Sequence, residues 1–219
     1  MTDVETSLTR NTLAIAVQAL TREDPLICGL VRQYGMPPLW QRSQSFATLV
    51  HIILEQKVSL ASAKAVMLRV QKLCPQMNHK QFLGVSEQRL RQVGISERKL
   101  SYCRSIAEAI DTGELDLSHL RRCTDAQVMD ALTSIRGIGP WSAGVYLLMA
   151  LRRPDAWASG DRALVVSLAE CADLPAVPGY AELDQWAERW RPYRAAAARV
   201  LWHAYLSRRS PGARQKRSS

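Results

Sequence analysis

The 219-residue sequence predicts an all-α fold, and three observations lead to this prediction. Apolar residues recur every three or four positions through much of the chain, which is the spacing of an amphipathic helix. Serine or threonine precedes several of these stretches and glycine follows some of them, as is typical of helix ends. No stretch alternates apolar and polar residues for long enough to form a sheet, and no repeat of fixed period is present.

The first expected helices lie between residues 45 and 113. "SFATLVHIIL" places Phe46, Leu49, Val50 and Ile53 at helical spacing, and "SLASAKAVMLRVQKL" continues the pattern with Ser59 as its N-cap. "SEQRLRQVG" and "SERKLSYCRSIAEAIDTG" each open with a serine and end at a glycine, which predicts two further helices.

The second group of helices follows residue 123. "TDAQVMDALTSI" opens with Thr124 and Gln127 in capping-box spacing, and Pro140 suits the first turn of the next helix, which we expect to run to residue 153. Further helices are expected over 161–172, 181–190 and 193–207. "YGMPPLW" (34–40) and "LPAVPGY" (174–180) are the expected linkers.

The composition is that of an ordinary folded protein. Apolar residues make up 47% of the chain, and no apolar run approaches the roughly 18 residues of a membrane span. The N-terminal residues include acids and lack a signal pattern, and the five cysteines form no CxxC pair. We therefore expect a cytoplasmic protein with reduced thiols and no membrane association.

The net charge is +9, and five of the nine charges lie in the tail at 207–219. We expect this tail to be solvated and disordered. A basic surplus favours polyanions in general, and it does not distinguish DNA from RNA or anionic lipid. The basic residues of the tail are Arg208, Arg209, Arg214, Lys216 and Arg217.

The segment "SIRGIGPWSAGVY" (134–146) predicts two helices joined by a sharp turn. Gly137 and Gly139 permit positive φ and leave main-chain N–H groups uncovered beside a helix N-terminus, which is a site for a phosphate oxygen. A plain corner between two helices, with glycine as a C-cap, is the alternative for this segment taken alone.

Several ordered motifs between about residue 44 and residue 206 resemble one protein family. "LTSIRGIGPWSAGVYLLMALRRPDAWASGDRALVVSL" is similar to the helix-hairpin-helix signature and aspartate loop of the helix-hairpin-helix DNA glycosylase superfamily. "FATLVHIILEQKVSLASAKAV", "VGISERKLSYCRSIAEAI" and "AERWRPYRAAAARVLWHAYL" resemble three more segments of its monofunctional 3-methyladenine DNA glycosylase II branch.

The resemblance implies a two-lobed helical fold with a cleft between the lobes and without the N-terminal β-domain of that branch. One lobe would comprise residues 44–150, with the helix-hairpin-helix at 125–152. Residues 1–43 would pack as helices with the C-terminal lobe, in which 151–206 hold the aspartate loop and the last helices.

Asp161 lies 22 positions beyond Gly139 and matches the catalytic aspartate of the family. Cleavage of an N-glycosidic bond builds positive charge on the deoxyribose, which a nearby carboxylate stabilises while it helps to position water. An aspartate before "RALVV" is also a good helix N-cap, and the two roles are compatible.

Aromatic residues are implied for the base pocket. Trp141 and Trp202 match tryptophans of the family, although both are also plausible core residues, and Val145 stands at the position of its pocket tyrosine, with Tyr146 one place later. An aromatic face favours a cationic alkylated purine.

Two features of the lyase-active branch are absent from the sequence. Trp141 replaces the lysine of that branch, so lyase activity is not expected. The four-cysteine iron–sulfur pattern is also missing, so no cluster is expected.

The resemblance further implies contacts with double-stranded DNA that carries damaged bases. Lys57 stands where the branch has an aliphatic wedge for the gap left by the flipped base. No cofactor is expected to be required, although a Na⁺ or K⁺ ion at the hairpin would be held by the main-chain carbonyls of Thr133, Ile135 and Ile138. The DNA-contacting residues would be Gln56, Lys57, Ser59, Arg136, Gly137, Ile138 and Gly139.

The expected function is a monomeric, monofunctional glycosylase that flips and excises alkylated bases and leaves an abasic site in base excision repair. Two alternatives remain open. One is a glycosylase for deaminated or mismatched bases, which the same scaffold supports. The other is a non-catalytic helix-hairpin-helix DNA-binding protein, against which Asp161 and the two tryptophans argue.

Overall fold

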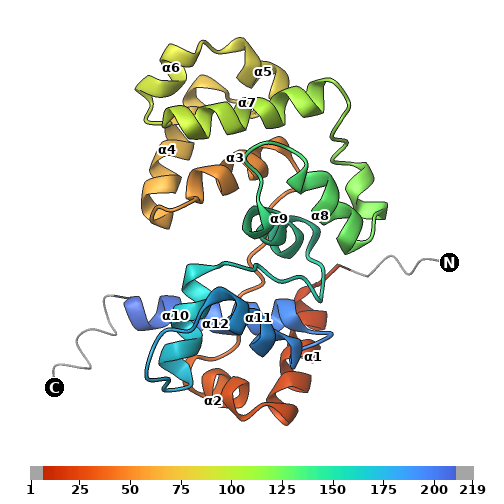
Figure 1. Ribbon diagram of the computed structural model, residues 1–219, viewed down its shortest axis with the longest axis vertical. Helices are drawn as coiled ribbons and strands as arrows, with labels where there is room; N and C mark the ends of the chain where they lie inside the picture. Colours follow the sequence, from red (N-terminus) through yellow and green to blue (C-terminus); the bar gives the residue numbers. More distant parts are fainter. Residues whose placement is uncertain (1–6, 211–219) are drawn as a thin grey trace. The chain divides into compact units, whose positions relative to one another are not determined.

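The computed structural model describes residues 7–210, and within this range every regular element is a helix (Figure 1). The all-α prediction is confirmed. The α-helices are α1 (Arg10–Glu23), α2 (Pro25–Tyr34), α3 (Phe46–Glu55), α4 (Leu60–Leu73), α5 (His79–Gly84), α6 (Glu87–Gln92), α7 (Glu97–Asp111), α8 (Asp125–Thr133), α9 (Pro140–Tyr146), α10 (Arg162–Cys171), α11 (Tyr180–Glu188) and α12 (Arg194–Arg209). A 3₁₀ helix, η1, spans His119–Arg122, and a π-helix, η2, spans Leu147–Leu151.

The described chain divides into two compact units. Unit 1 is one continuous segment, residues 42–151. Unit 2 is formed by the described residues on either side of that segment, 7–41 and 152–210.

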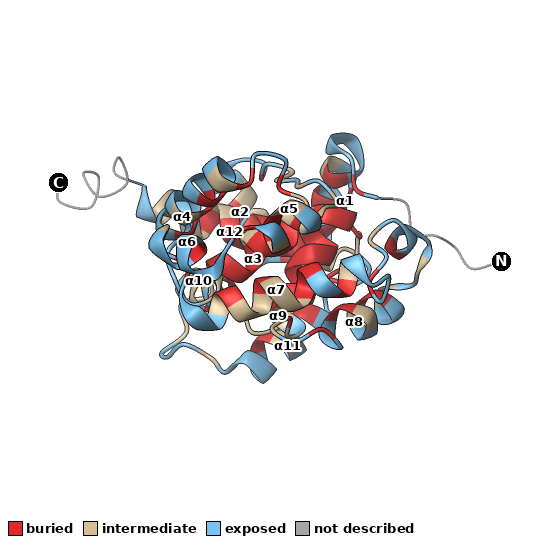
Figure 2. Ribbon diagram, turned by 90° about the horizontal axis from the view of Figure 1, so that it is seen from above, coloured by how far each residue is buried: buried red, intermediate tan, exposed pale blue. Residues whose placement is uncertain are grey.

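Unit 1 is organised around α3, whose residues are nearly all buried (Figure 2). Helices α4, α7 and α9 pack against it, because its apolar side chains cover more than one face of the helix. At its start the ring of Phe46 meets that of Phe82 from α5 edge-on, with centroids 5.4 Å apart. The spacing of apolar residues did not predict α5 and η1, because these helices are too short to show a repeated apolar pattern.

Unit 2 is organised around α12, which contacts α1, α2, α10 and α11. The four alanines at 195–198 are fully buried, and their small side chains let neighbouring helices approach closely. Ser167 of α10 adds a polar link, because its hydroxyl donates to the carbonyl oxygen of Leu201 at 2.7 Å. The two chain segments of unit 2 are therefore held together by its last helix.

Several expected helix boundaries differ from the observed ones by one or two residues, among them the end of α11 at Glu188 instead of 190. After Tyr146 the helix that begins at Pro140 continues as the π-helical turn η2 and ends at Leu151, two residues before the expected end. Helix α12 runs to Arg209, so the expected start of a disordered tail at 207 is wrong. Arg208 and Arg209 form ion pairs with Glu170, at 3.4 and 2.6 Å, which explains why the helix continues. The tail residues 211–219 lie outside the described part of the chain.

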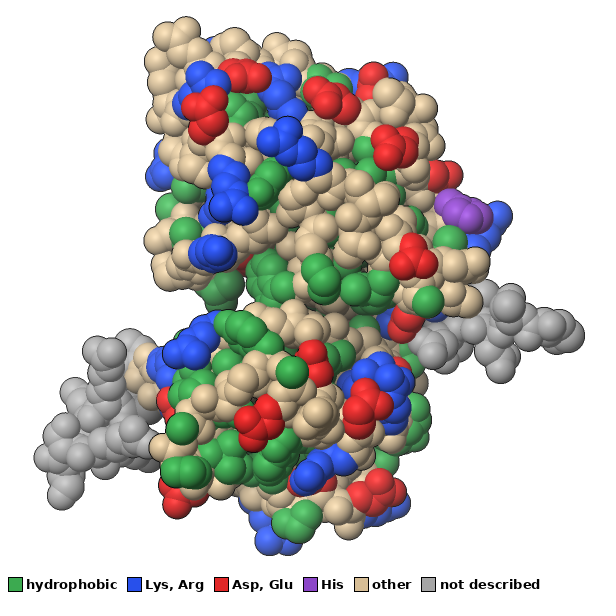
Figure 3. All heavy atoms as spheres, in the orientation of Figure 1, with side chains coloured by type: hydrophobic (Ala, Val, Ile, Leu, Met, Phe, Trp, Pro, Cys, Tyr) green, Lys and Arg blue, Asp and Glu red, His purple; other side chains and the backbone are tan. Residues whose placement is uncertain are grey.

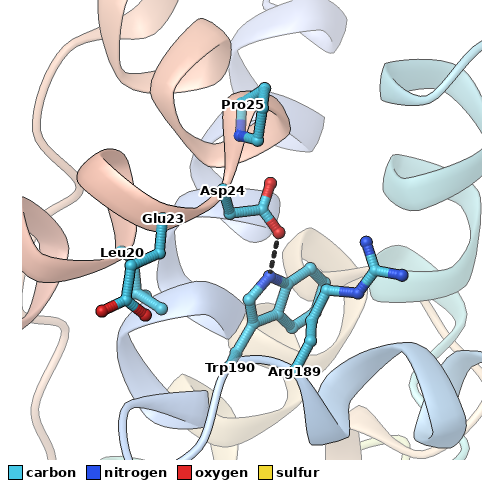
Figure 4. A pocket seen from close by; sticks show the side chains of 6 residues that line it. All are labelled: Leu20, Glu23, Asp24, Pro25, Arg189 and Trp190. Carbon is cyan, nitrogen blue, oxygen red and sulfur yellow. Dashed lines mark hydrogen bonds between the residues drawn. The ribbon is translucent and has the colours of Figure 1, made fainter.

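A shallow hollow of about 400 Å³ lies in unit 2 beside Trp190 (Figure 4). The indole nitrogen of Trp190 donates to Asp24 at 2.8 Å, and the other oxygen of Asp24 caps α2. These bonds give Asp24 and Trp190 a structural role. The hollow is lined by Leu20, Glu23, Asp24, Pro25, Arg189 and Trp190, none of which the sequence predicted as a site residue.

Lys and Arg side chains are interspersed with acidic ones on the face shown in Figure 3. Within residues 7–210, no helix has both the length and the apolar character needed to cross a lipid bilayer.

Candidate functional site

Asp161 is the N-cap of α10 and is 7% exposed. Its Oδ1 accepts a hydrogen bond from the main-chain N–H of Leu164 at 2.9 Å. A carboxylate at this position also lies at the positive end of the helix dipole, which favours its negative charge. The capping interpretation of Asp161 is confirmed, and the geometry leaves its catalytic role possible as well, because capping needs only an oxygen acceptor and not the charge.

Trp202 of α12 lies against Asp161. Its indole Nε1–H donates to the same oxygen, Oδ1, at 3.1 Å, and the residue is 8% exposed. The structure thus brings together two of the predicted site residues, which are 41 positions apart in the sequence. Trp202 was expected as a wall of the base pocket, and the hydrogen bond gives it a second role, which is to fix the orientation of the Asp161 carboxylate.

The hairpin in unit 1 joins α8 to α9. Thr124 and Gln127 form the predicted capping box at the start of α8, and Pro140 occupies the first turn of α9 as expected. Between the helices the main-chain N–H of Ile138 donates to the carbonyl oxygen of Ile135 at 3.1 Å. This bond closes a tight turn that ends at the N-terminus of α9.

The two hairpin glycines differ in their backbone conformation and in the space available for a Cβ atom. Gly137 has φ of +98°, and a Cβ there would overlap the ring of Tyr102 from α7. Gly139 has φ of −99°, and a Cβ there would meet no protein atom within 4 Å. Only Gly137 uses the positive φ that both glycines permit, because Gly139 stands as the extended N-cap of α9, a conformation open to any residue.

The end of α3 is tied to the hairpin by Gln56. Its side-chain nitrogen donates to the carbonyl oxygen of Gly137 and to the hydroxyl of Ser142, both at 3.0 Å. Gln56, predicted as a DNA contact, therefore forms its hydrogen bonds within unit 1 and stabilises the turn.

The other two predicted DNA contacts near α3 lie in the loop that leads to α4. Ser59 caps α4 through its hydroxyl, as predicted. Lys57 is exposed and has φ of +57° in the loop between these helices.

Two more interactions hold the C-terminal end of α3. Lys99 donates its ammonium to the carbonyl oxygen of Leu54 at 2.7 Å, and burial lowers the pKa of Lys99. Glu55 is buried and accepts two hydrogen bonds from Arg42, at 2.9 and 2.6 Å. His51 lies 3.6 Å from Glu55, and burial lowers its pKa although the nearby Glu55 charge opposes this shift.

The remaining predicted residues lie in unit 1. Arg136 is exposed beside the hairpin, Ile138 is buried, and Trp141 is half-buried at the start of α9. Tyr146 is fully buried, and its phenolic oxygen has no hydrogen-bond partner in the structure. Burial raises the pKa of Tyr146, so its hydroxyl is neutral.

The loop at residues 152–160, which precedes Asp161, contains interactions that the sequence did not predict. Asp184 of α11 accepts hydrogen bonds from the indole nitrogen of Trp157 at 2.9 Å and from the hydroxyl of Ser159 at 2.5 Å. Asp155 forms ion pairs with Arg191 at 2.5 Å and with Arg194 at 2.9 Å. The only sequence signal was the "WRPYR" motif, which holds both arginines.

The model of the family described as "HhH-GPD superfamily base excision DNA repair protein" matches residues 50–192. DNA-3-methyladenine glycosylase 1 of Schizosaccharomyces pombe is 26% identical over an alignment of 207 positions, which covers 91% of this chain and 89% of that protein.

Two solved structures are also similar. The DNA-3-methyladenine glycosidase of Bacillus halodurans has a TM-score of 0.73 and 27% identity, covering 93% of this chain and 96% of that one. The 3-methyladenine DNA glycosylase Mag1 of S. pombe, in complex with abasic DNA, has a TM-score of 0.79 at 22% identity and covers 90% and 97% of the two chains. The latter shows a shared fold.

Proposed function

This chain belongs to the HhH-GPD superfamily of base excision DNA repair proteins, and from that premise we propose that it is a DNA glycosylase that hydrolyses the N-glycosidic bond of alkylated bases. The observation that carries the proposal is the capped, hydrogen-bonded carboxylate of Asp161 at the start of α10. The names of the similar proteins support 3-methyladenine and related N-alkylated purines as the substrate class.

Asp161 acts through its charge. As the base departs, positive charge builds on the deoxyribose, and a carboxylate already oriented by the Leu164 amide and the Trp202 indole stabilises it without reorganisation. The same carboxylate orients the water that attacks the sugar carbon. An N-alkylated purine carries a formal positive charge and leaves readily, so the chain needs no strong general acid.

The hairpin holds the DNA backbone. The start of α9 offers main-chain N–H groups to a phosphate oxygen, and Gly139 leaves the approach to them open. Contacts of this kind position the protein without reading sequence. The exposed Arg136 and Lys57 supply positive charge on the same unit.

A monovalent cation fits the chemistry of the hairpin carbonyls. Thr133 ends α8, where main-chain carbonyls lack intrahelical partners, and Ile135 and Ile138 follow in the turn. Carbonyl oxygens are hard ligands suited to Na⁺ or K⁺. Such an ion, when bound, would supply positive charge beside a DNA phosphate.

The reaction stops at the abasic site. Trp141 offers no amine to form an imine with the sugar, so strand cleavage is not expected. Treatment of the wild-type enzyme and its substrate duplex with borohydride tests this point. No covalent enzyme–DNA adduct is expected, and a trapped adduct would overturn the monofunctional mechanism.

We further propose that the protein acts as a monomer in the cytoplasm, on double-stranded DNA.

A panel of duplexes tests the substrate class. Each carries a single 3-methyladenine, 7-methylguanine, ethenoadenine, hypoxanthine or uracil, and abasic sites are revealed by alkaline cleavage after incubation with the wild-type protein. We expect excision of the two methylated purines. Excision confined to hypoxanthine or uracil would instead establish a glycosylase for deaminated bases, and excision of none would contradict the proposed activity.

A further inference from the structure

The segment that leads into Asp161 has no helical hydrogen bonds to fix its shape. Residues 152–160 connect η2 to α10, and Gly160, next to the aspartate, has φ of +81°. Main-chain hydrogen bonds from Asp161 to the carbonyl oxygen of Ala158 (3.2 Å) and from Ala195 to that of Pro154 (3.1 Å) fix part of its path, and the side chains of the segment fix the rest. The position of the Asp161 carboxylate depends on them, because a helix N-cap follows the main chain that carries it.

Two acidic side chains hold this segment at different points. Near its start, Asp155 is bound by Arg191 and Arg194, which lie between α11 and the first turn of α12. Near its end, Asp184 of α11 is bound by Trp157 and Ser159. Ser159 lies two residues before Asp161, so the second point of attachment is the closer to the reaction.

Asp184 uses both of its oxygens. Oδ1 accepts from the Trp157 indole N–H at 2.9 Å, and Oδ2 accepts from the Ser159 hydroxyl at 2.5 Å. The indole ring of Trp157 also packs on that of Trp190, with centroids 5.9 Å apart. A carboxylate accepts at both oxygens, whereas an amide of the same shape accepts at one and donates at the other.

We propose that Asp184 is a positioning residue for the glycosylase reaction, a role that rests on the proposed function. By holding Trp157 and Ser159, it fixes the main chain at Gly160 and thereby the carboxylate of Asp161. It acts on Asp161 through these residues. Its loss should therefore slow the bond-breaking step more than it weakens DNA binding.

The test compares Asp184→Asn with Asp116→Asn. Asp116 is a matched control, because it also accepts a serine hydroxyl, that of Ser118, within a loop, but in unit 1. The single-turnover excision rate is measured with excess enzyme on a 3-methyladenine duplex, and the Kd is measured on a duplex with a stable abasic analogue. We expect Asp184→Asn to lower the rate about tenfold or more, since small misplacements of reacting groups are costly. The Kd and the thermal midpoint should stay close to wild type, and Asp116→Asn should change none of these values.

A double-mutant cycle separates positioning from general loss of structure. If Ser159 acts through Asp184, then Ser159→Ala slows the wild-type enzyme but adds little to Asp184→Asn. Additive effects of the two substitutions would overturn the proposal. So would an Asp184→Asn rate equal to the wild-type rate, or a loss of rate that only follows a loss of stability.

A readout independent of excision completes the test. Hydrogen exchange of the Trp202 indole N–H, followed by NMR, reports the bond to Asp161 without any substrate. We expect faster exchange in Asp184→Asn than in Asp116→Asn. Equal exchange would overturn the positioning role even if the enzyme is active. If the wild-type protein excises no base, the proposed function fails, and this exchange measurement alone decides the role of Asp184.

Discussion

Trp202 donates its indole N–H to the Asp161 oxygen that also caps α10, so one carboxylate oxygen is fixed by both a helix end and an aromatic side chain. This arrangement orients the carboxylate before any substrate is bound. Substitution can separate the contribution of Asp161 to catalysis from its contribution to stability. Catalysis depends on the charge of the carboxylate, whereas helix capping needs only an oxygen that accepts a hydrogen bond.

Asp161→Asn should abolish excision and leave the fold intact. Asparagine caps helices as well as aspartate does, and its carbonyl oxygen can accept from Leu164 and Trp202, but it carries no charge. We expect the single-turnover rate to fall at least about a hundredfold, as when other electrostatic contacts to a transition state are removed. The thermal midpoint and the Kd for damaged duplex should remain near wild type.

Asp161→Ala is the matched comparison for that variant. It removes the cap together with the charge and should cost about 1 kcal/mol in the free energy of unfolding, measured by urea denaturation. An Asp161→Asn enzyme with a rate near that of the wild type would contradict the catalytic assignment.

Trp202→Phe should slow excision while it retains an aromatic ring beside Asp161. The substitution removes the N–H donor together with part of the indole ring, and a hydrogen bond to a charged acceptor contributes about 1.5–3 kcal/mol, so a tenfold or greater loss of rate is expected. Single-turnover kinetics measure this effect. Trp186→Phe is the control, since Trp186 contacts Arg189 in the same unit and should tolerate the change. Equal rates for wild type and Trp202→Phe would show that the indole N–H of Trp202 does not orient Asp161 for the reaction.

The two hairpin glycines should respond differently to alanine. Gly137→Ala forces positive φ on a residue with a Cβ and overlaps Tyr102, and should cost about 2 kcal/mol or more in the free energy of unfolding. Gly139→Ala places a Cβ with no atom beyond its chain neighbours within 4 Å and should cost less, about 1 kcal/mol or below, because alanine is a poorer N-cap than glycine. It should instead weaken binding equally for damaged and undamaged duplex, because its Cβ obstructs the approach of a phosphate.

Fluorescence anisotropy on both duplexes, together with urea denaturation, measures the two effects. A loss of affinity for damaged duplex alone in Gly139→Ala would place the hairpin at the base pocket. Unchanged affinity for both duplexes would show that no phosphate approaches Gly139.

Acidification should destabilise the protein partly through His51. Burial lowers the pKa of His51 in the folded state, so the unfolded chain binds a proton more readily, and stability is lost as the pH falls below the ordinary histidine value of about 6.5. The urea midpoint should therefore decline more steeply between about pH 7 and about pH 5 in wild type than in His51→Gln. Parallel curves would show that the folded-state pKa of His51 is not lowered.

The local signals of the sequence predicted most of the helices. Ser59, Thr124 with Gln127, and Pro140 are all found at the helix starts where their side chains or ring predicted them, because capping depends on neighbours within three residues. The π-helical turn at Leu147–Leu151 carries no such local signal, and the expected helix end was accordingly misplaced.

The hydrogen-bond partners of polar side chains were harder to predict from the sequence. The amide of Gln56 suits a DNA phosphate as well as a carbonyl, and only the fold shows that Gly137 and Ser142 bind it. Asp184 is 27 positions from Trp157, and no spacing rule predicts a contact across the intervening helix. Asp161 was found through its place in a motif, whereas its bond to Trp202 needed the packing of α12 on α10.

Unit 2 is built from segments on either side of unit 1, which fixes the order in which its helices are synthesised on the ribosome. Helices α1 and α2 are translated before unit 1, yet α12, on which they pack, is translated after it. Until then α1 and α2 have no α12 to pack against, while the continuous unit 1 already has all its residues. A chain that stops just before residue 194 would therefore contain a complete unit 1 and four helices of unit 2, α1, α2, α10 and α11, that lack their common partner α12, a form prone to aggregation and degradation.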